Sequence, residues 1–134
     1  MYGSVIVVDA SVVVEMLLRT ADAEMVEERV LGSGEPLHAP HLLDVEVAQV
    51  LRRYARGGEI SEHRGRVMLG LLGEMPLTRH AHVPLAERVW ALRENLTAYD
   101  ATYVALAESL GATLLTRDAA MARAPGVRAE VEII

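Results

Sequence analysis

The sequence predicts an α/β fold, a three-layer α/β/α sandwich built on a parallel sheet. Short apolar runs rich in β-branched residues alternate with longer segments of helical periodicity, and this alternation is typical of a parallel sheet covered by helices. The first run contains Val5-Ile6-Val7-Val8, which predicts a strand buried on both faces. At 134 residues the chain is expected to form one domain, 1–134.

The first half of the chain predicts strands and helices in alternation. A helix is expected directly after the first strand, and a more acidic amphipathic helix follows it. A short strand comes next, and Pro40 precedes a well-marked helix that Gly57-Gly58 stops. Ser61 starts another helix, whose later half is almost wholly apolar. The predicted ranges are 4–8 and 37–39 for the strands, and 11–19, 22–31, about 41–56 and 61–72 for the helices.

The second half repeats the alternation. Residues 76–83 predict a connector or a short strand, after which Pro84 suits the first position of a helix over 85–95. A further helix is expected over 97–110, closed by Gly111. The remaining ranges are a buried strand over 113–116, a short helix through Met121 and a last strand within 127–134 at an edge of the sheet.

The composition excludes several kinds of chemistry. The chain has no cysteine, and all thirteen of its basic residues are arginine. Disulfides, thiolate nucleophiles, Schiff-base lysines and P-loops are therefore excluded. The net charge of −6 argues against binding of nucleic acid by bulk attraction, although metal ions and a few arginines can still hold a polyanion locally. With no apolar run long enough to span a membrane and no targeting segment, the protein is expected to be soluble and cytoplasmic.

Four carboxylates lie at strand ends or on apolar helix faces, where folding alone does not require an acidic residue. Asp9 and Asp118 each follow a short buried strand, so both are expected at the same edge of a parallel sheet. Glu46 borders the apolar stripe of its helix, and Asp100 lies on a helix face that is otherwise apolar. An unpaired buried carboxylate is costly and needs a partner.

Each carboxylate also has an ordinary structural explanation. Asp9 and Asp118 could be N-caps, Asp100 could favour the positive end of its helix, and Glu46 could pair with Arg53. Each of these explanations remains open for its own residue. That all four carboxylates have only a structural role is less expected than that they form one shared site. Oxygen ligands without supporting histidine or cysteine suit a hard cation, Mg²⁺ or Mn²⁺, and such an ion commonly serves phosphate chemistry.

Other polar residues have weaker claims to a role. The histidines lack a carboxylate at zinc-site spacing, so they are interpreted as surface or packing residues. Ser11 and Thr116 lie two residues from Asp9 and Asp118, where a hydroxyl either orients a ligand carboxylate or caps a helix. A group of arginines either touches a phosphate backbone or forms a solvated helix face, and the second is favoured. The group is Arg52, Arg53, Arg56, Arg64 and Arg66.

Four segments together resemble a PIN domain of the VapC toxin type, in order and over nearly the whole chain. They are Val8-Asp9-Ala10-Ser11-Val12, Glu46-Val47-Ala48, the block from Tyr99 to Glu108, and Leu115-Thr116-Arg117-Asp118. Of the four segments, the Tyr99–Glu108 block is the one most specific to this family. One departure is Gln49, where many relatives carry asparagine.

The resemblance implies an α/β/α sandwich and a metal-dependent endoribonuclease that cleaves RNA. It implies that Asp9, Glu46, Asp100 and Asp118 form an acidic quartet for Mg²⁺ or Mn²⁺, with Thr116 as a supporting hydroxyl. It also implies inhibition by a cognate antitoxin and a homodimer. The predicted helix segment Val67–Leu72 carries more apolar surface than one helix face can bury, which fits coverage by a partner.

Competing functions can be weighed on the same residues. A response-regulator receiver needs a lysine that this chain lacks, and a haloacid-dehalogenase-type phosphatase needs an aspartate where Ser11 stands. A PIN-like binding module without catalysis would have lost part of the quartet. The remaining alternative is a PIN nuclease outside any toxin–antitoxin pair, which only the neighbouring gene would distinguish.

Overall fold

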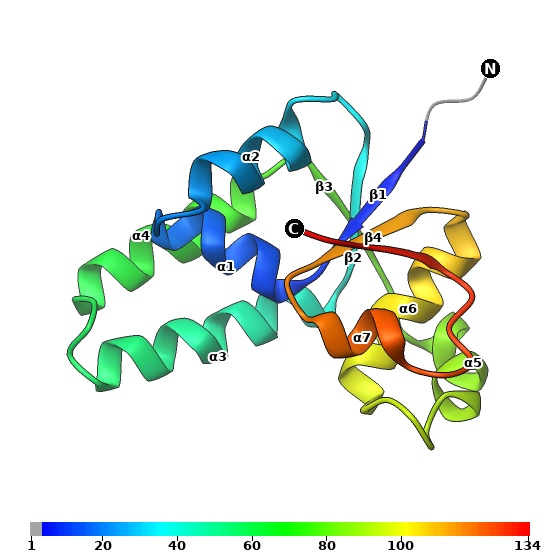
Figure 1. The fold of residues 1–134 in the computed structure, drawn as a ribbon. Helices are drawn as coiled ribbons and strands as arrows, with labels where there is room; N and C mark the ends of the chain where they lie inside the picture. The colour runs from blue at the N-terminus through cyan, green and yellow to red at the C-terminus, as the bar shows by residue number, and fades with distance from the viewer. Residues whose placement is uncertain (1–3) are drawn as a thin grey trace.

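The computed structural model describes residues 4–134 and places five parallel strands in one sheet (Figure 1). The strands are β1 (Ile6–Val8), β2 (Leu37–Pro40), β3 (Leu77–His80), β4 (Thr113–Thr116) and β5 (Glu130–Ile133). Their order across the sheet is β3-β2-β1-β4-β5, and every neighbouring pair is parallel. The predicted α/β class and parallel sheet are confirmed.

The first strand lies at the centre of the sheet, as its sequence predicts. All three residues of β1 are fully buried, because helices cover both of its faces and strands flank both of its edges. On one side Val8 stands opposite Leu115 of β4. The residues that follow these two strands therefore emerge side by side at the carboxyl edge of the sheet.

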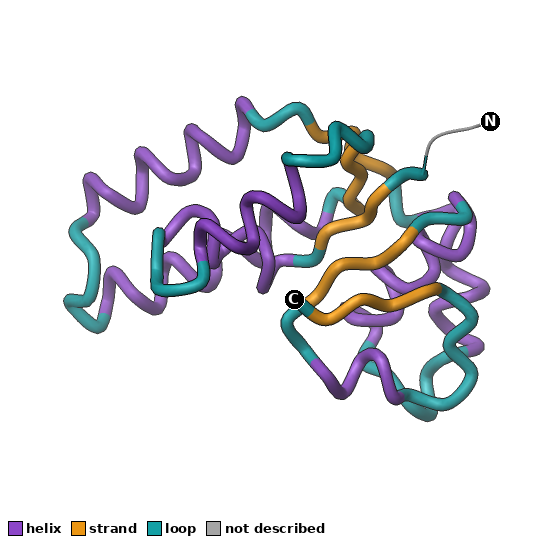
Figure 2. The backbone as a smooth tube through the Cα atoms, turned by 45° about the horizontal axis from the view of Figure 1, so that its top comes forward, coloured by secondary structure: helices purple, strands orange, loops and turns teal. Residues whose placement is uncertain are grey.

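Helices pack on both faces of the sheet and complete the three layers (Figures 1 and 2). On one face α6 lies against the central strands, with α5 packed on it. On the other side α1 packs with α2, α3 and α4, and α3 and α4 extend as a pair away from the sheet. The helices are α1 (Ala10–Leu18), α2 (Ala23–Leu31), α3 (Leu42–Arg56), α4 (Glu62–Glu74), α5 (Ala86–Ala91), α6 (Ala98–Leu110) and α7 (Ala119–Arg123).

The region between α4 and α6 differs most from the sequence-based expectation. Of the connector or short strand expected over 76–83, the structure has the strand, β3. The single helix expected over 85–95 is instead a 3₁₀ turn (Val83–Leu85) followed by the short helix α5. The helix ends early because the backbone N–H of Leu92 bonds to both Arg88 and Val89 carbonyls, which tightens the last turn. Leu85 and Leu92 are nevertheless buried, so the apolar spacing predicted burial correctly and helix length wrongly.

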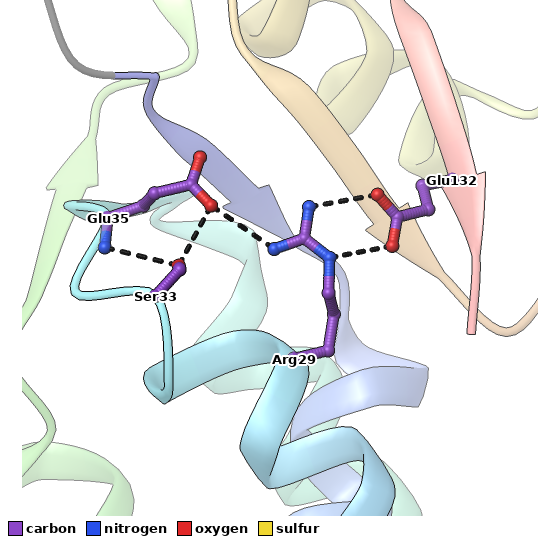
Figure 3. Close-up of polar contacts among 4 residues, drawn as sticks. All are labelled: Arg29, Ser33, Glu35 and Glu132. Atoms are coloured by element: carbon purple, nitrogen blue, oxygen red, sulfur yellow. Dashed lines mark hydrogen bonds and ion pairs between the residues drawn. The ribbon is translucent and has the colours of Figure 1, made fainter.

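Ion pairs of Arg29 connect α2 to β5, the last strand (Figure 3). The Nε and Nη2 atoms of Arg29 bond both carboxylate oxygens of Glu132 on β5, at 2.7 and 2.8 Å, and Nη1 reaches Glu35 at 3.2 Å. These hydrogen bonds lower the pKa of Glu132. Because β5 is an edge strand with a neighbour on one side only, this paired arginine helps to hold it in register.

Two surface properties bear on partners. Among residues 4–134, none of the helices combines the length and apolar character needed to cross a bilayer. On α4, Met68 and Leu72 are buried, whereas Val67, Leu69 and Leu71 are exposed. The apolar run that the sequence singled out thus leaves part of its surface uncovered by the chain itself.

Candidate active site

Asp9 sits where β1 passes into α1, at the carboxyl edge of the sheet. It is 5% exposed and is the N-cap of α1, with Oδ1 accepting the backbone N–H of Val12 at 3.3 Å. Two hydroxyls also donate to it: Ser11 to Oδ1 and Thr116 to Oδ2, each at 2.5 Å. Asp9 is therefore both a cap and a carboxylate oriented by its neighbours, which combines the two explanations that the sequence left open.

The same two hydroxyls connect Asp9 to the loop after β4. The Ser11 hydroxyl accepts the backbone N–H of Arg117, and the Thr116 hydroxyl accepts that of Asp118, both at 3.0 Å. Each hydroxyl thus accepts from the loop and donates its proton to Asp9. This arrangement fixes the direction of both hydroxyl protons and holds the β4–α7 loop against the end of β1.

Burial opposes the charge on Asp9. Desolvation raises the pKa of this carboxyl above its ordinary value, while the hydrogen bonds from Ser11, Thr116 and the α1 backbone act in the opposite direction. Burial is the larger effect. The folded protein therefore keeps a carboxylate in an environment that disfavours its charge, unless a positive charge comes close.

Glu46 lies one turn inside α3 and points toward α6. Its Oε1 accepts a hydrogen bond of 2.6 Å from the Tyr103 hydroxyl. Tyr103 is 1% exposed, and burial followed by this hydrogen bond raises the pKa of its phenol, so the hydroxyl remains a donor. Arg53, the alternative partner considered from the sequence, forms no ion pair with Glu46 in the described part of the chain.

Asp100 is half-buried in the first turn of α6, whose N-cap is Thr97. Its pKa is raised, first by burial and then by the negative charges of Asp118, Glu46 and Asp9. The positive end of the helix helps to accommodate Asp100, so the ordinary structural explanation holds in part. Asp9, Glu46 and Asp118 therefore lie within electrostatic range of Asp100.

Asp118 is the most accessible member of the quartet. It is exposed and caps α7, with Oδ1 accepting the backbone N–H of Ala120 at 2.9 Å. Its second carboxylate oxygen has no hydrogen bond among residues 4–134. That oxygen remains available to a ligand.

The four carboxylates suit a hard divalent cation, although their side chains do not form a complete coordination site. The four groups offer carboxylate oxygens only, which Mg²⁺ and Mn²⁺ prefer, and the raised pKa of Asp100 records repulsion that a cation would relieve. Within residues 4–134, however, no three Asp, Glu or His side chains converge closely enough to hold an ion as they stand. Sharing one ion requires these side chains to move closer together.

Four of the five histidines, His38, His41, His80 and His82, contact one another or the backbone. His38 Nδ1 and His80 Nε2 are 2.8 Å apart, and His82 Nε2 accepts the backbone N–H of Leu42 at the start of α3. Burial, followed by the neighbouring His80, lowers the pKa of His38. These contacts agree with the packing role expected from the sequence.

Tyr103 is the site residue that sequence reasoning missed. Its spacing placed it on the apolar face of its helix, and the buried ring fits that assignment. The missed signal is the hydroxyl, because a buried tyrosine needs a hydrogen-bond partner.

Comparisons with known proteins relate the chain to one family. The family model described as "PIN domain" matches residues 6–127. The chain is 43% identical over 129 residues to "Ribonuclease VapC1" of Mycobacterium tuberculosis, covering 96% of each chain. It is 45% identical over 113 residues to "VapC ribonuclease Mb0985" of Mycobacterium bovis, covering 84% of this chain and 85% of the relative.

A solved structure extends the likeness to three dimensions. PAE2754 from Pyrobaculum aerophilum superposes with a TM-score of 0.73 at 25% identity, covering 97% of this chain and 84% of the other. The α/β architecture derived above is thus the architecture of a known protein.

Proposed function

The chain belongs to the PIN domain family, and from this membership we propose that it is a metal-dependent endoribonuclease, the toxin of a toxin–antitoxin pair. The proposal assigns the activity to one domain spanning residues 1–134. Its main support in the structure is that Asp9 and Asp118 follow neighbouring parallel strands and are joined through the Thr116 hydroxyl, with Glu46 and Asp100 on helices beside them. The relatives named as ribonucleases supply the reaction class.

The proposed ligands of Mg²⁺ or Mn²⁺ are Asp9, Glu46, Asp100 and Asp118. A bound divalent cation would neutralise charge on the scissile phosphate and make a water molecule more acidic. Asp9 is the central ligand in this proposal, because the middle strand of the sheet and two hydroxyls fix its position. Glu46 and Asp100 come from helices that can adjust around it.

The chain's own residues would prepare the site by orienting the acids. Thr116 and Ser11 direct their protons at Asp9, which keeps its oxygens turned toward the carboxyl edge of the sheet. Tyr103 holds Glu46 on the side of α3 that faces α6. Groups that hydrogen-bond metal ligands in this way commonly set the orientation and basicity of those ligands.

Incubation of the purified protein with total RNA tests the reaction class. We expect new internal RNA ends in Mg²⁺ or Mn²⁺ and none in excess chelator, because without the ion nothing activates a water molecule or neutralises charge that develops on the scissile phosphate. Mapping the ends by sequencing would identify the target. Since RNA is the proposed substrate, we place the site of action in the cytoplasm.

Failure to cut any RNA in the presence of either ion would contradict the proposed nuclease. Equal cutting with and without chelator would contradict its dependence on metal.

We propose two partner surfaces, one for an antitoxin and one for a second copy. Val67 and Leu71, at positions i and i+4 of α4, form an exposed apolar strip that the chain leaves uncovered, and Leu71 is 50% exposed. Trp90 is 68% exposed and belongs to α5, a helix on the other side of the molecule from α4 (Figure 1). Exposed apolar patches of this kind commonly mark protein interfaces. We assign the α4 strip to the antitoxin and the Trp90 surface to the homodimer.

Two substitutions distinguish these surfaces, and each is the other's control. Leu71→Glu should weaken binding to the product of the adjacent gene by about ten-fold or more and leave the dimer intact. Trp90→Glu should give a monomer in analytical ultracentrifugation and leave antitoxin binding intact. A wild-type protein that is monomeric and binds no adjacent gene product would contradict both assignments.

A further inference from the structure

A cleft of about 440 Å³ opens beside Glu46, one of the four acids. Its lining includes Ala10, the residue after Asp9, and Glu46 itself, together with Tyr99, the residue before Asp100. The volume falls in the range of small-molecule sites, about 300–1,000 Å³. The cleft thus adjoins the proposed catalytic site through Glu46. Its other lining residues are not among the proposed metal ligands.

One wall of the cleft is a stripe on α3 that runs away from the acids. Glu46, Gln49, Val50 and Arg53 are spaced at i, i+3, i+4 and i+7 and line the same cleft. Arg53 therefore lies two helical turns from Glu46, about 10 Å along the axis. It is exposed and forms no ion pair among residues 4–134, so its charge remains available to a phosphate that neighbours the one being cut.

The first turn of α6 adds an aromatic ring to the lining of the cleft. Tyr99 is 61% exposed, in a chain where aromatic residues are only 4% of the total. Single-stranded RNA is commonly held by stacking of its bases on such rings and by arginine contacts to its backbone. Gln49, between the acid and the arginine of the α3 stripe, adds an amide that can hydrogen-bond the edge of a base.

We propose that this cleft binds the nucleotide next to the bond that is cut, with its base on Tyr99 and a flanking phosphate on Arg53. The inference rests on the proposed ribonuclease function and adds a substrate subsite to it. Leu42, Val45 and Val50 give the cleft an apolar floor beside Glu46. RNA is favoured over a protein occupant because an exposed aromatic ring, an amide and an arginine without an ion pair among residues 4–134 line the same cleft. Gln49 then contributes to base preference.

Binding of a short labelled single-stranded RNA, measured by fluorescence anisotropy in chelator so that no cleavage occurs, tests this subsite. Tyr99→Leu should raise Kd by about ten-fold, whereas Tyr99→Phe keeps the ring and should bind like wild type. Arg53→Gln should weaken binding and lower the salt slope, log Kd against log salt, by about 0.7, the value for one lost phosphate contact on a single strand. In Mg²⁺ both Tyr99→Leu and Arg53→Gln should raise KM more than they lower kcat.

Arg52→Gln is the matched control. Arg52 is the adjacent exposed arginine on α3, but it lines a separate cleft between α3 and α4. Its loss should leave the affinity and the salt slope within two-fold of wild type.

Wild-type affinity in Tyr99→Leu and Arg53→Gln would overturn the subsite while leaving RNA cleavage by the wild-type protein as evidence for the nuclease. A wild-type protein that does not cleave RNA in Mg²⁺ would instead overturn the proposed function. If the two variants dissociate a dimer and keep their affinity for RNA, the cleft is a contact between copies and the subsite is wrong.

Discussion

Asp9→Asn should abolish RNA cleavage while leaving the fold in place. Asparagine keeps the size and shape of the side chain, and its amide oxygen can still accept the hydrogen bonds from Val12 and Ser11, while its NH2 group would donate to the Thr116 hydroxyl instead of accepting from it. The substitution removes the charge of the proposed central ligand. Loss of one preorganised electrostatic group in an active site commonly costs about 10²–10³ in kcat, and we expect at least that loss here.

The measurement is kcat/KM on a defined RNA in saturating Mg²⁺, with thermal melting to verify the fold. Glu62→Gln on α4 is a suitable control, because it also removes one negative charge but its side chain is 84% exposed. The control should cleave like wild type. Undiminished cleavage by Asp9→Asn would show that the active site lies elsewhere.

Asp100→Asn should make the metal-free protein more stable than wild type. Burial and three neighbouring carboxylates raise the pKa of Asp100 in the folded state above its ordinary value near 3.8. Between that ordinary value and the raised folded value, the folded state binds more protons than the unfolded chain. Stability therefore falls as pH rises through this window, and the full penalty is present at neutral pH. The amide removes that penalty, so the variant should melt at a higher temperature in chelator.

Metal should narrow or reverse this difference. An ion that binds the folded state but not the unfolded chain stabilises wild type by about 2.7 kcal/mol when the free ion is at a hundred times its Kd. The variant should gain clearly less stability from the same ion concentration. The measurement is a set of melting curves for both proteins with chelator and with Mn²⁺. Equal shifts of both proteins on adding Mn²⁺ would mean that Asp100 is only a residue of the helix N-terminus.

Much of the sheet could be predicted because local sequence decides it. Val5-Ile6-Val7-Val8 is too short and too β-branched for a helix, and its burial followed from that pattern. The positions of Asp9 and Asp118 followed as well, because parallel neighbouring strands end at the same edge. Even the N-cap alternatives for these two aspartates were correct, since a residue that ends a strand and caps a helix can also face a ligand.

The sequence could not predict features that depend on tertiary contacts. The 85–95 segment has good helical spacing, yet its last turn tightens at Leu92 before Thr97 caps the next helix. The contact between Tyr103 and Glu46 joins residues 57 positions apart, and no local pattern indicates which acid a buried hydroxyl will meet. The cleft beside the acids arises from three separate segments and has no signature in any one of them.

Direct titration of Mn²⁺ into the metal-free protein by calorimetry tests the central claim, that four carboxylates form one divalent-cation site. We predict binding by wild type and by the Glu62→Gln control. Each of Asp9→Asn, Glu46→Gln, Asp100→Asn and Asp118→Asn should weaken it by about ten-fold or more, since loss of a group that only hydrogen-bonds a ligand already costs 10- to 100-fold. Wild-type affinity for Mn²⁺ in these four variants would contradict the account.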